Sequence, residues 1–109
     1  MEKVYIICWA RALGGDGMPV DASAGSDGVY MNREQALKAL TKSKDEWISV
    51  IYENIEDAED KDLISKSLQV YGSEAEEFYE IDYTAPDETS VEIHITLQEA
   101  DLVTEEEPA

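Results

Sequence analysis

The second half of the chain contains two apolar–polar alternations joined by a short turn, and this pattern constrains the fold most strongly. Residues 78–84 place Tyr79, Ile81 and Tyr83 on one side of an extended chain, and residues 89–98 repeat the alternation. Between them, residues 85–88 read Ala-Pro-Asp-Glu, with proline where a type I turn prefers it. The pattern predicts a β-hairpin. Its core face is expected to consist of Val91, Ile93, Ile95 and Leu97, with Ser90, Glu92, His94 and Thr96 facing outward.

The first residues also have the composition of a β-strand. In residues 3–10, Val4, Ile6, Cys8 and Ala10 fall on one face, whereas Tyr5, Ile7 and Trp9 fall on the other. A strand with two apolar faces is expected at the centre of a sheet or covered on both sides. The second cover would come from the following loop or from another chain, so a homodimer is a possible state.

Residues 13–28 contain five of the six glycines together with Pro19 and three aspartates, and this composition predicts a loop. A loop of that length is expected to be either mobile or functional, for instance as a lid. The run Gly14-Gly15-Asp16-Gly17 is not a phosphate cradle, because it lacks the lysine and contains an acid that would repel phosphate.

A long helix is predicted next. Asn32 is a candidate N-cap with Gln35 as its capping-box partner, and an apolar stripe continues from residue 33 to about residue 58. A shorter helix followed by a strand is the alternative, because residues 48–52 have β-like composition. The acids at 56–60 are expected to end the helix, since negative charge is unfavourable at its C-terminus. Residues 62–71 fit either a helix or a strand, and a strand over 67–71 is favoured.

These elements indicate an α+β fold, with an antiparallel or mixed β-sheet and one long helix packed on one face. At 109 residues the chain is expected to form a single domain over residues 1–103, followed by a disordered acidic tail over 104–109. No signal peptide or membrane span is recognised, so a cytoplasmic location away from membranes is expected.

The order of elements resembles small bacterial and phage proteins to which no activity is assigned. The resemblance rests on Gly-Val-Tyr-Met-Asn-Arg-Glu-Gln-Ala at residues 28–36 and on the Tyr-Glu-Ile and Val-Glu-Ile-His-Ile segments of the hairpin. It covers residues 28–97 loosely. It implies a sheet with a helix on one face, and it implies no catalytic residues.

Charge is distributed very unevenly along the chain. Residues 1–52 have seven acids and six bases, whereas residues 53–109 have nineteen acids and only two bases, Lys61 and Lys66. Such a field repels nucleic acid and anionic membranes, and it attracts basic protein surfaces. The predicted function is therefore a protein-interaction module, such as a phage-type inhibitor or nucleic-acid mimic. The candidate partner-binding residues are Glu53, Glu56, Asp57, Asp60, Asp62, Glu76 and Glu77.

Catalytic and metal-binding residue sets are not evident. The chain has one cysteine, Cys8, and one histidine, His94, which is too few for a zinc site and weak support for a nucleophile–base pair. The acids at 57–62 lack the glycine of a calcium-binding loop. We expect no enzyme activity, no cofactor and no metal. The alternative function is a small ligand-binding or enzymatic domain with residues 13–28 as a lid.

Overall fold

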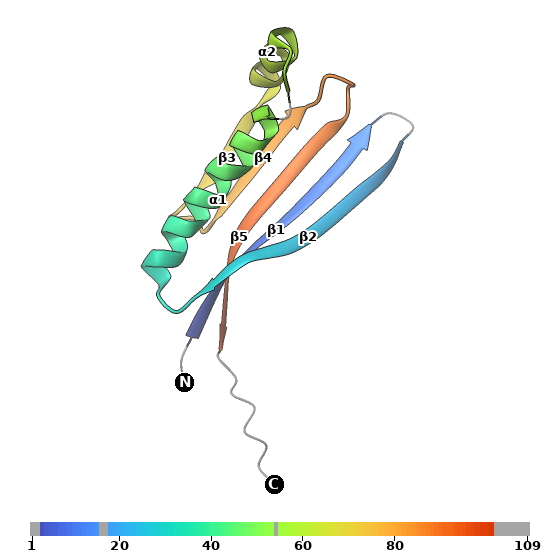
Figure 1. Ribbon diagram of the computed structural model, residues 1–109. Coiled ribbons are helices and arrows are strands. Elements are labelled where there is room, and N and C mark those ends of the chain that lie inside the picture. Colours follow the sequence, from blue (N-terminus) through green and yellow to red (C-terminus); the bar gives the residue numbers. More distant parts are fainter. Residues whose placement is uncertain (1–2, 16–17, 54, 102–109) are drawn as a thin grey trace.

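The fold is an antiparallel five-stranded sheet with two helices, seen in a computed structural model that describes residues 3–15, 18–53 and 55–101 (Figure 1). The strand order is β2-β1-β5-β4-β3, and every neighbouring pair is antiparallel. This arrangement confirms the predicted α+β class. The elements, in chain order, are β1 (Lys3–Gly15), β2 (Met18–Tyr30), α1 (Arg33–Glu53), α2 (Ala58–Ser67), β3 (Gln69–Ser73), β4 (Phe78–Thr84) and β5 (Ser90–Asp101).

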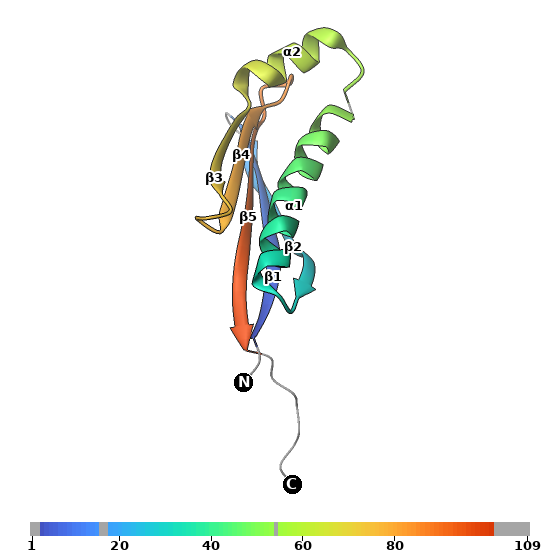
Figure 2. The same cartoon turned by 90° about the vertical axis from the view of Figure 1, so that its left-hand side faces the viewer.

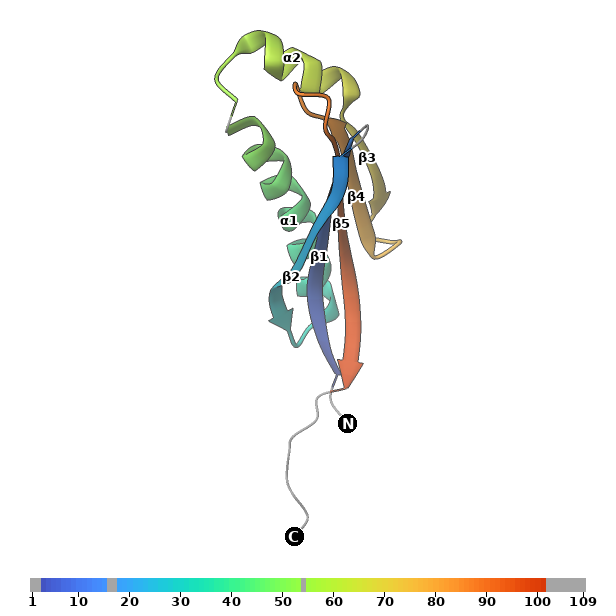
Figure 3. The ribbon, with the colours of Figure 1, turned by 90° about the vertical axis from the view of Figure 1, so that its right-hand side faces the viewer.

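Both helices lie on the same side of the sheet. Figures 2 and 3 show α1 running along this side, with α2 across one end of the molecule. α1 contacts β1, β2, β4 and β5, whereas α2 contacts β4. No described helix covers the opposite side of the sheet (Figure 3). None of the described helices has the length and apolar character that crossing a membrane requires.

The predicted hairpin provides the centre of the core. The inward residues of β5 are buried, as is Ile81 of β4, and they pack with Ile7 of β1 and Leu40 of α1. β1 lies between β2 and β5, which confirms that its two apolar faces indicate a central strand. The predicted cap of α1 is also present, because the amide of Gln35 donates to Asn32 Oδ1 over 3.2 Å.

The prediction of a loop over residues 13–28 is wrong. β1 continues to Gly15, and β2 begins at Met18 and pairs with β1, with register irregularities between Ile7 and Cys8 and between Leu13 and Gly15. Glycine in this segment lets a neighbouring side chain come close to the backbone, as the packing around Gly25 shows. A Cβ atom on Gly25 would lie 2.9 Å from the ring of Trp9, so the indole packs directly over the β2 backbone.

The chain between the long helix and the hairpin also differs from the prediction. α1 ends at Glu53, and neither the continuation to residue 58 nor the alternative strand over 48–52 is present. The acids that were expected only to stop α1 also start α2. Asp57 is its N-cap and accepts from the amide of Glu59 over 2.8 Å, and acids in the first turn are favoured by the helix dipole. The strand predicted over 67–71 is β3, shifted to Gln69–Ser73. The tail predicted over 104–109 lies outside the described residues.

Candidate interaction surfaces

The seven acids predicted to bind a partner fall into two separate groups. Glu53, Glu56, Asp57, Asp60 and Asp62 surround the connection between α1 and α2, at one end of the molecule (Figure 1). Glu76 and Glu77 belong to the turn between β3 and β4, at the opposite end of those two strands. The structure therefore does not bring all seven residues into one patch.

The group near α2, here called the α2 acidic end, consists of Glu53, Glu56, Asp57, Glu59, Asp60 and Asp62. Two of these acids have structural partners. Asp57 caps α2, and Asp62 accepts an ion pair from Lys66 over 2.9 Å. Glu53, Glu56 and Glu59 are exposed and Asp60 is half-buried. None of these four forms an ion pair with another described residue, and the cations of α2 are Lys61 and Lys66.

The acids of the β3–β4 turn have contacts that hold the turn in place. Glu77 pairs with Arg33 at the start of α1, and Glu76 accepts from the hydroxyl of Ser73 over 3.2 Å. Glu74, another acid of this turn, accepts from the hydroxyl of Thr41 on α1. These contacts fasten the turn to the helix, so its acids are less available to a partner than those at the α2 acidic end.

The side of the sheet that the helices leave uncovered, here called the open face, has two chemically different halves. The β1–β2 half is an apolar strip, and the β4–β5 half is an acidic strip in which Glu80, Asp82 and Glu92 surround His94. The register pairs Ala10 with His94 and Ala12 with Glu92. On the other side of β5, His94 is paired with Glu80 and Glu92 with Asp82. The apolar strip consists of Ile6, Cys8, Ala10, Ala12, Ala22, Ala24 and Val29.

The acidic strip is electrostatically crowded. Burial and, after it, the nearby Glu80 carboxylate together raise the pKa of Asp82 to about 6, although His94 opposes the rise. Asp82 Oδ1 is buried and has no hydrogen-bond partner among the described residues. The imidazole of His94 lies beside these carboxylates, and its Nδ1 is 3.3 Å from Glu80 Oε1.

This crowding leads to a pH-dependent prediction for Asp82→Asn. A carboxyl group whose pKa is higher in the folded than in the unfolded chain destabilises the fold when it ionises. The penalty is absent below about pH 4 and complete above about pH 6. Asp82→Asn should therefore raise the free energy of unfolding by about 1 kcal/mol at pH 8, allowing for solvent screening, and by almost nothing at pH 4. Urea unfolding at the two pH values measures this difference.

Asp87→Asn is the matched control for that experiment. The hydrogen bonds from Thr89 lower the pKa of Asp87, and the Thr89 amide lies 3.1 Å from its Oδ1. Asp87→Asn should therefore lower the free energy of unfolding at pH 8, whereas Asp82→Asn raises it. If both variants changed stability in the same direction at pH 8, the assignment of crowding to Asp82 would be wrong.

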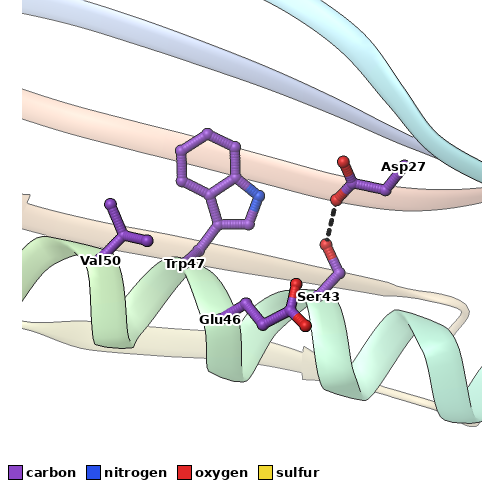
Figure 4. A pocket seen from close by; sticks show the side chains of 5 residues that line it. All are labelled: Asp27, Ser43, Glu46, Trp47 and Val50. Carbon is purple, nitrogen blue, oxygen red and sulfur yellow. Dashed lines mark hydrogen bonds between the residues drawn. The ribbon is translucent and has the colours of Figure 1, made fainter.

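Two hollows flank Trp47 on the helix side of the sheet. The smaller, of about 270 Å³, is lined by Asp27, Ser43, Glu46, Trp47 and Val50 (Figure 4). There the buried hydroxyl of Ser43 donates to Asp27 Oδ2 over 2.6 Å and so joins α1 to β2. Trp47 also meets Trp9 edge-on, with ring centroids 5.3 Å apart.

The larger hollow, of about 430 Å³, lies where α1 and α2 meet the sheet. Its described lining is mainly apolar and includes Trp47, Ile55, Ile64 and Tyr83, and Arg11 is its one charged lining residue. The described residues of the segment 13–28, which the alternative function treats as a lid, belong to the strands β1 and β2 rather than to a loop.

The two residues considered for catalysis, Cys8 and His94, lie on the same face of the sheet. In the sheet, Cys8 is paired with Thr96, which is two residues from His94 on β5. The side chain of His94 lies near the carboxylates of Glu80 and Glu92. Among the described residues, no group of three or more His, Cys, Asp or Glu side chains has an arrangement that could hold a metal ion.

Comparison with known proteins adds no assignment to these surfaces. No family model matches the chain, and neither a curated protein nor a solved structure matches it significantly.

Proposed function

We propose that this protein is an acidic interaction module that binds a basic surface of a partner protein, in the manner of a phage-type inhibitor or nucleic-acid mimic. The observation that carries the proposal is the α2 acidic end, where exposed carboxylates without cationic partners gather at one extremity of the fold. We place this role in the cytoplasm, where Cys8 would persist as a free thiol.

The negative charge of the α2 acidic end is expected to act mainly on the rate of association with a partner. A chain with a net charge of −18 attracts a basic surface over distances comparable with the Debye length, about 8–10 Å in physiological salt. Such attraction accelerates association more than it strengthens the final complex. Duplex DNA presents similar negative charge to proteins that bind it, so the same basic groove would accept either ligand.

The triple reversal of Glu53, Glu56 and Asp60 to lysine tests the proposal. It shifts the net charge by +6 and spares Asp57, which caps α2, and Asp62, which pairs with Lys66. The partner is first isolated by affinity capture at low salt. Stopped-flow or surface-binding kinetics should then show an association rate that is at least about tenfold lower for the variant, whose fold is retained.

Three reversals elsewhere provide the control. Glu34, Glu46 and Glu88 changed to lysine also shift the charge by +6, but they lie outside the α2 acidic end. This control should slow association less than the test variant. Duplex DNA should compete with the protein for the partner. Binding that ignores salt, the reversals and DNA would contradict the proposal.

A small-ligand role is the second candidate, and the 430 Å³ apolar hollow beneath α1 and α2 favours it. An apolar dye with a sulfonate group, such as anilinonaphthalene sulfonate, should enter this hollow with its anion near Arg11 and quench Trp47. Ala85→Phe fills part of the hollow and should weaken the quenching. Equal quenching in both proteins would exclude this site.

A further inference from the structure

The open face has a hollow at the boundary between its two strips. This hollow, of about 300 Å³, is lined by alanines of β1 and β2, with Arg11 and Ser23 between them, and by Glu92 and His94 of β5. The register places Arg11 and Ser23 on the helix side of the sheet, in one row with Ile93. Small side chains produce the depression, because neighbouring strands present only methyl groups there. The alanines are Ala10, Ala12, Ala22 and Ala24. An apolar side chain from outside would fit between methyl groups and carboxylates.

The flanks of the hollow indicate what kind of molecule would occupy it. On the apolar side, Val29 is 62% exposed, and it lies next to the half-buried Ile6 and Cys8 in the apolar strip. On the acidic side, no described lysine or arginine forms an ion pair with Glu80, Asp82 or Glu92, and Asp82 Oδ1 lacks a hydrogen-bond donor among the described residues. The face thus offers apolar contact and uncompensated negative charge side by side.

A second copy of this chain fits such a face poorly. When two copies pack face to face about a twofold axis, the acidic strip of one meets either the acidic strip or the apolar strip of the other. Both arrangements place carboxylates in a dry interface without cations, which is unfavourable. The net charge of −18 on each copy adds long-range repulsion.

We propose that the open face docks an amphipathic basic segment of a partner protein. Apolar side chains of that segment would lie on the β1–β2 strip and in the alanine-lined hollow, and its lysine or arginine side chains would lie over Glu80, Asp82 and Glu92. This inference rests on the proposed function, because it assumes a basic protein partner. It adds a second contact surface, on the sheet rather than at the α2 acidic end.

A labelled helical peptide of about five turns, with leucines on one side and lysines on the other, is the probe. Its binding is measured by fluorescence anisotropy at about 0.15 M salt, and backbone NMR shifts locate the contact. A peptide of the same composition in scrambled order is the reference. We expect the amphipathic peptide to bind at least about tenfold more tightly, with shifts concentrated on β1, β2 and β5.

Paired variants separate specific docking from attraction by net charge. Glu80→Gln with Glu92→Gln should weaken peptide binding about tenfold, whereas Glu53→Gln with Glu56→Gln, an equal change of charge, should weaken it less than about twofold. Ala10→Lys, on the exposed apolar strip, should weaken binding similarly, and Ala75→Lys in the exposed β3–β4 turn should not.

Three results would overturn the inference. The first is equal affinity for the amphipathic and the scrambled peptide, and the second is an equal loss of affinity in the two pairs of glutamate variants. The third is a dimer in light scattering that Ala10→Lys dissociates, because this result would assign the face to a second copy. The proposed function is tested separately. If a captured partner responds to reversals at the α2 acidic end but not to Glu80→Gln with Glu92→Gln, the interaction module stands and the open face is not its docking site.

Discussion

Replacement of Ile95 by aspartate is expected to abolish the cooperative unfolding transition of this protein. Ile95 is fully buried on β5, between Trp9 of β1 and Tyr79 of β4. An unpaired carboxylate there must be desolvated or protonated, at a cost of several kcal/mol, comparable with the whole stability of a small domain. Circular dichroism should show a broad, non-cooperative thermal transition.

Two other substitutions make this expectation specific. Ile95→Val removes one methylene group without adding charge and should cost only about 1 kcal/mol. Ile93→Asp should be less damaging than Ile95→Asp, because Ile93 borders the larger hollow and is paired across the sheet with Arg11. If Ile95→Asp melted within a few degrees of the parent, the assignment of this face of β5 to the core would be wrong.

Gly72→Ala is expected to produce the second largest loss of stability. Gly72 has a φ of +94°, which side chains rarely adopt, and a Cβ atom there would lie 2.2 Å from the carbonyl oxygen of Phe78. The obstacle is backbone of the paired strand and cannot rotate away. Strain and displacement together should lower the free energy of unfolding by about 2–4 kcal/mol, as measured in urea.

Gly25→Ala is the control for this substitution. The added Cβ would also be close to a neighbour, at 2.9 Å, but that neighbour is the side chain of Trp9 and the backbone of Gly25 is unstrained. A ring can shift by a few tenths of an ångström where a hydrogen-bonded strand cannot. Gly25→Ala should therefore cost less than half as much. Equal costs would mean that the β3–β4 backbone adjusts freely around Gly72.

Local patterns in the sequence predicted the hairpin of β4 and β5 and the start of α1. The alternation from Val91 to Leu97 has period two and follows a turn with proline, so neighbouring residues suffice to specify it. Asn32 and Gln35 likewise specify the beginning of α1 within one helical turn. Both elements are specified by residues that are close together in the chain, and for this reason they could be predicted from the sequence.

The strand β2 could not be recognised in this way. Its residues are largely glycine, alanine, serine and aspartate, which have low β-propensity, and their pairing with β1 rather than their own preference makes them extended. The break between α1 and α2 has a similar origin. The acids near Asp57 disfavour the end of one helix and favour the start of another, and composition alone does not distinguish these effects.

The sequence by itself determined the amount of negative charge, its concentration after residue 53 and the presence of two apolar faces on the first strand. Only the tertiary structure decided that the seven candidate acids form two groups, that two of them cap or pair within the α2 end, and that the uncovered face of the sheet combines an apolar strip with Glu80, Asp82 and Glu92. The physical reason is that charge and hydrophobicity belong to single residues, whereas a surface depends on strand register and helix placement between residues far apart in the chain.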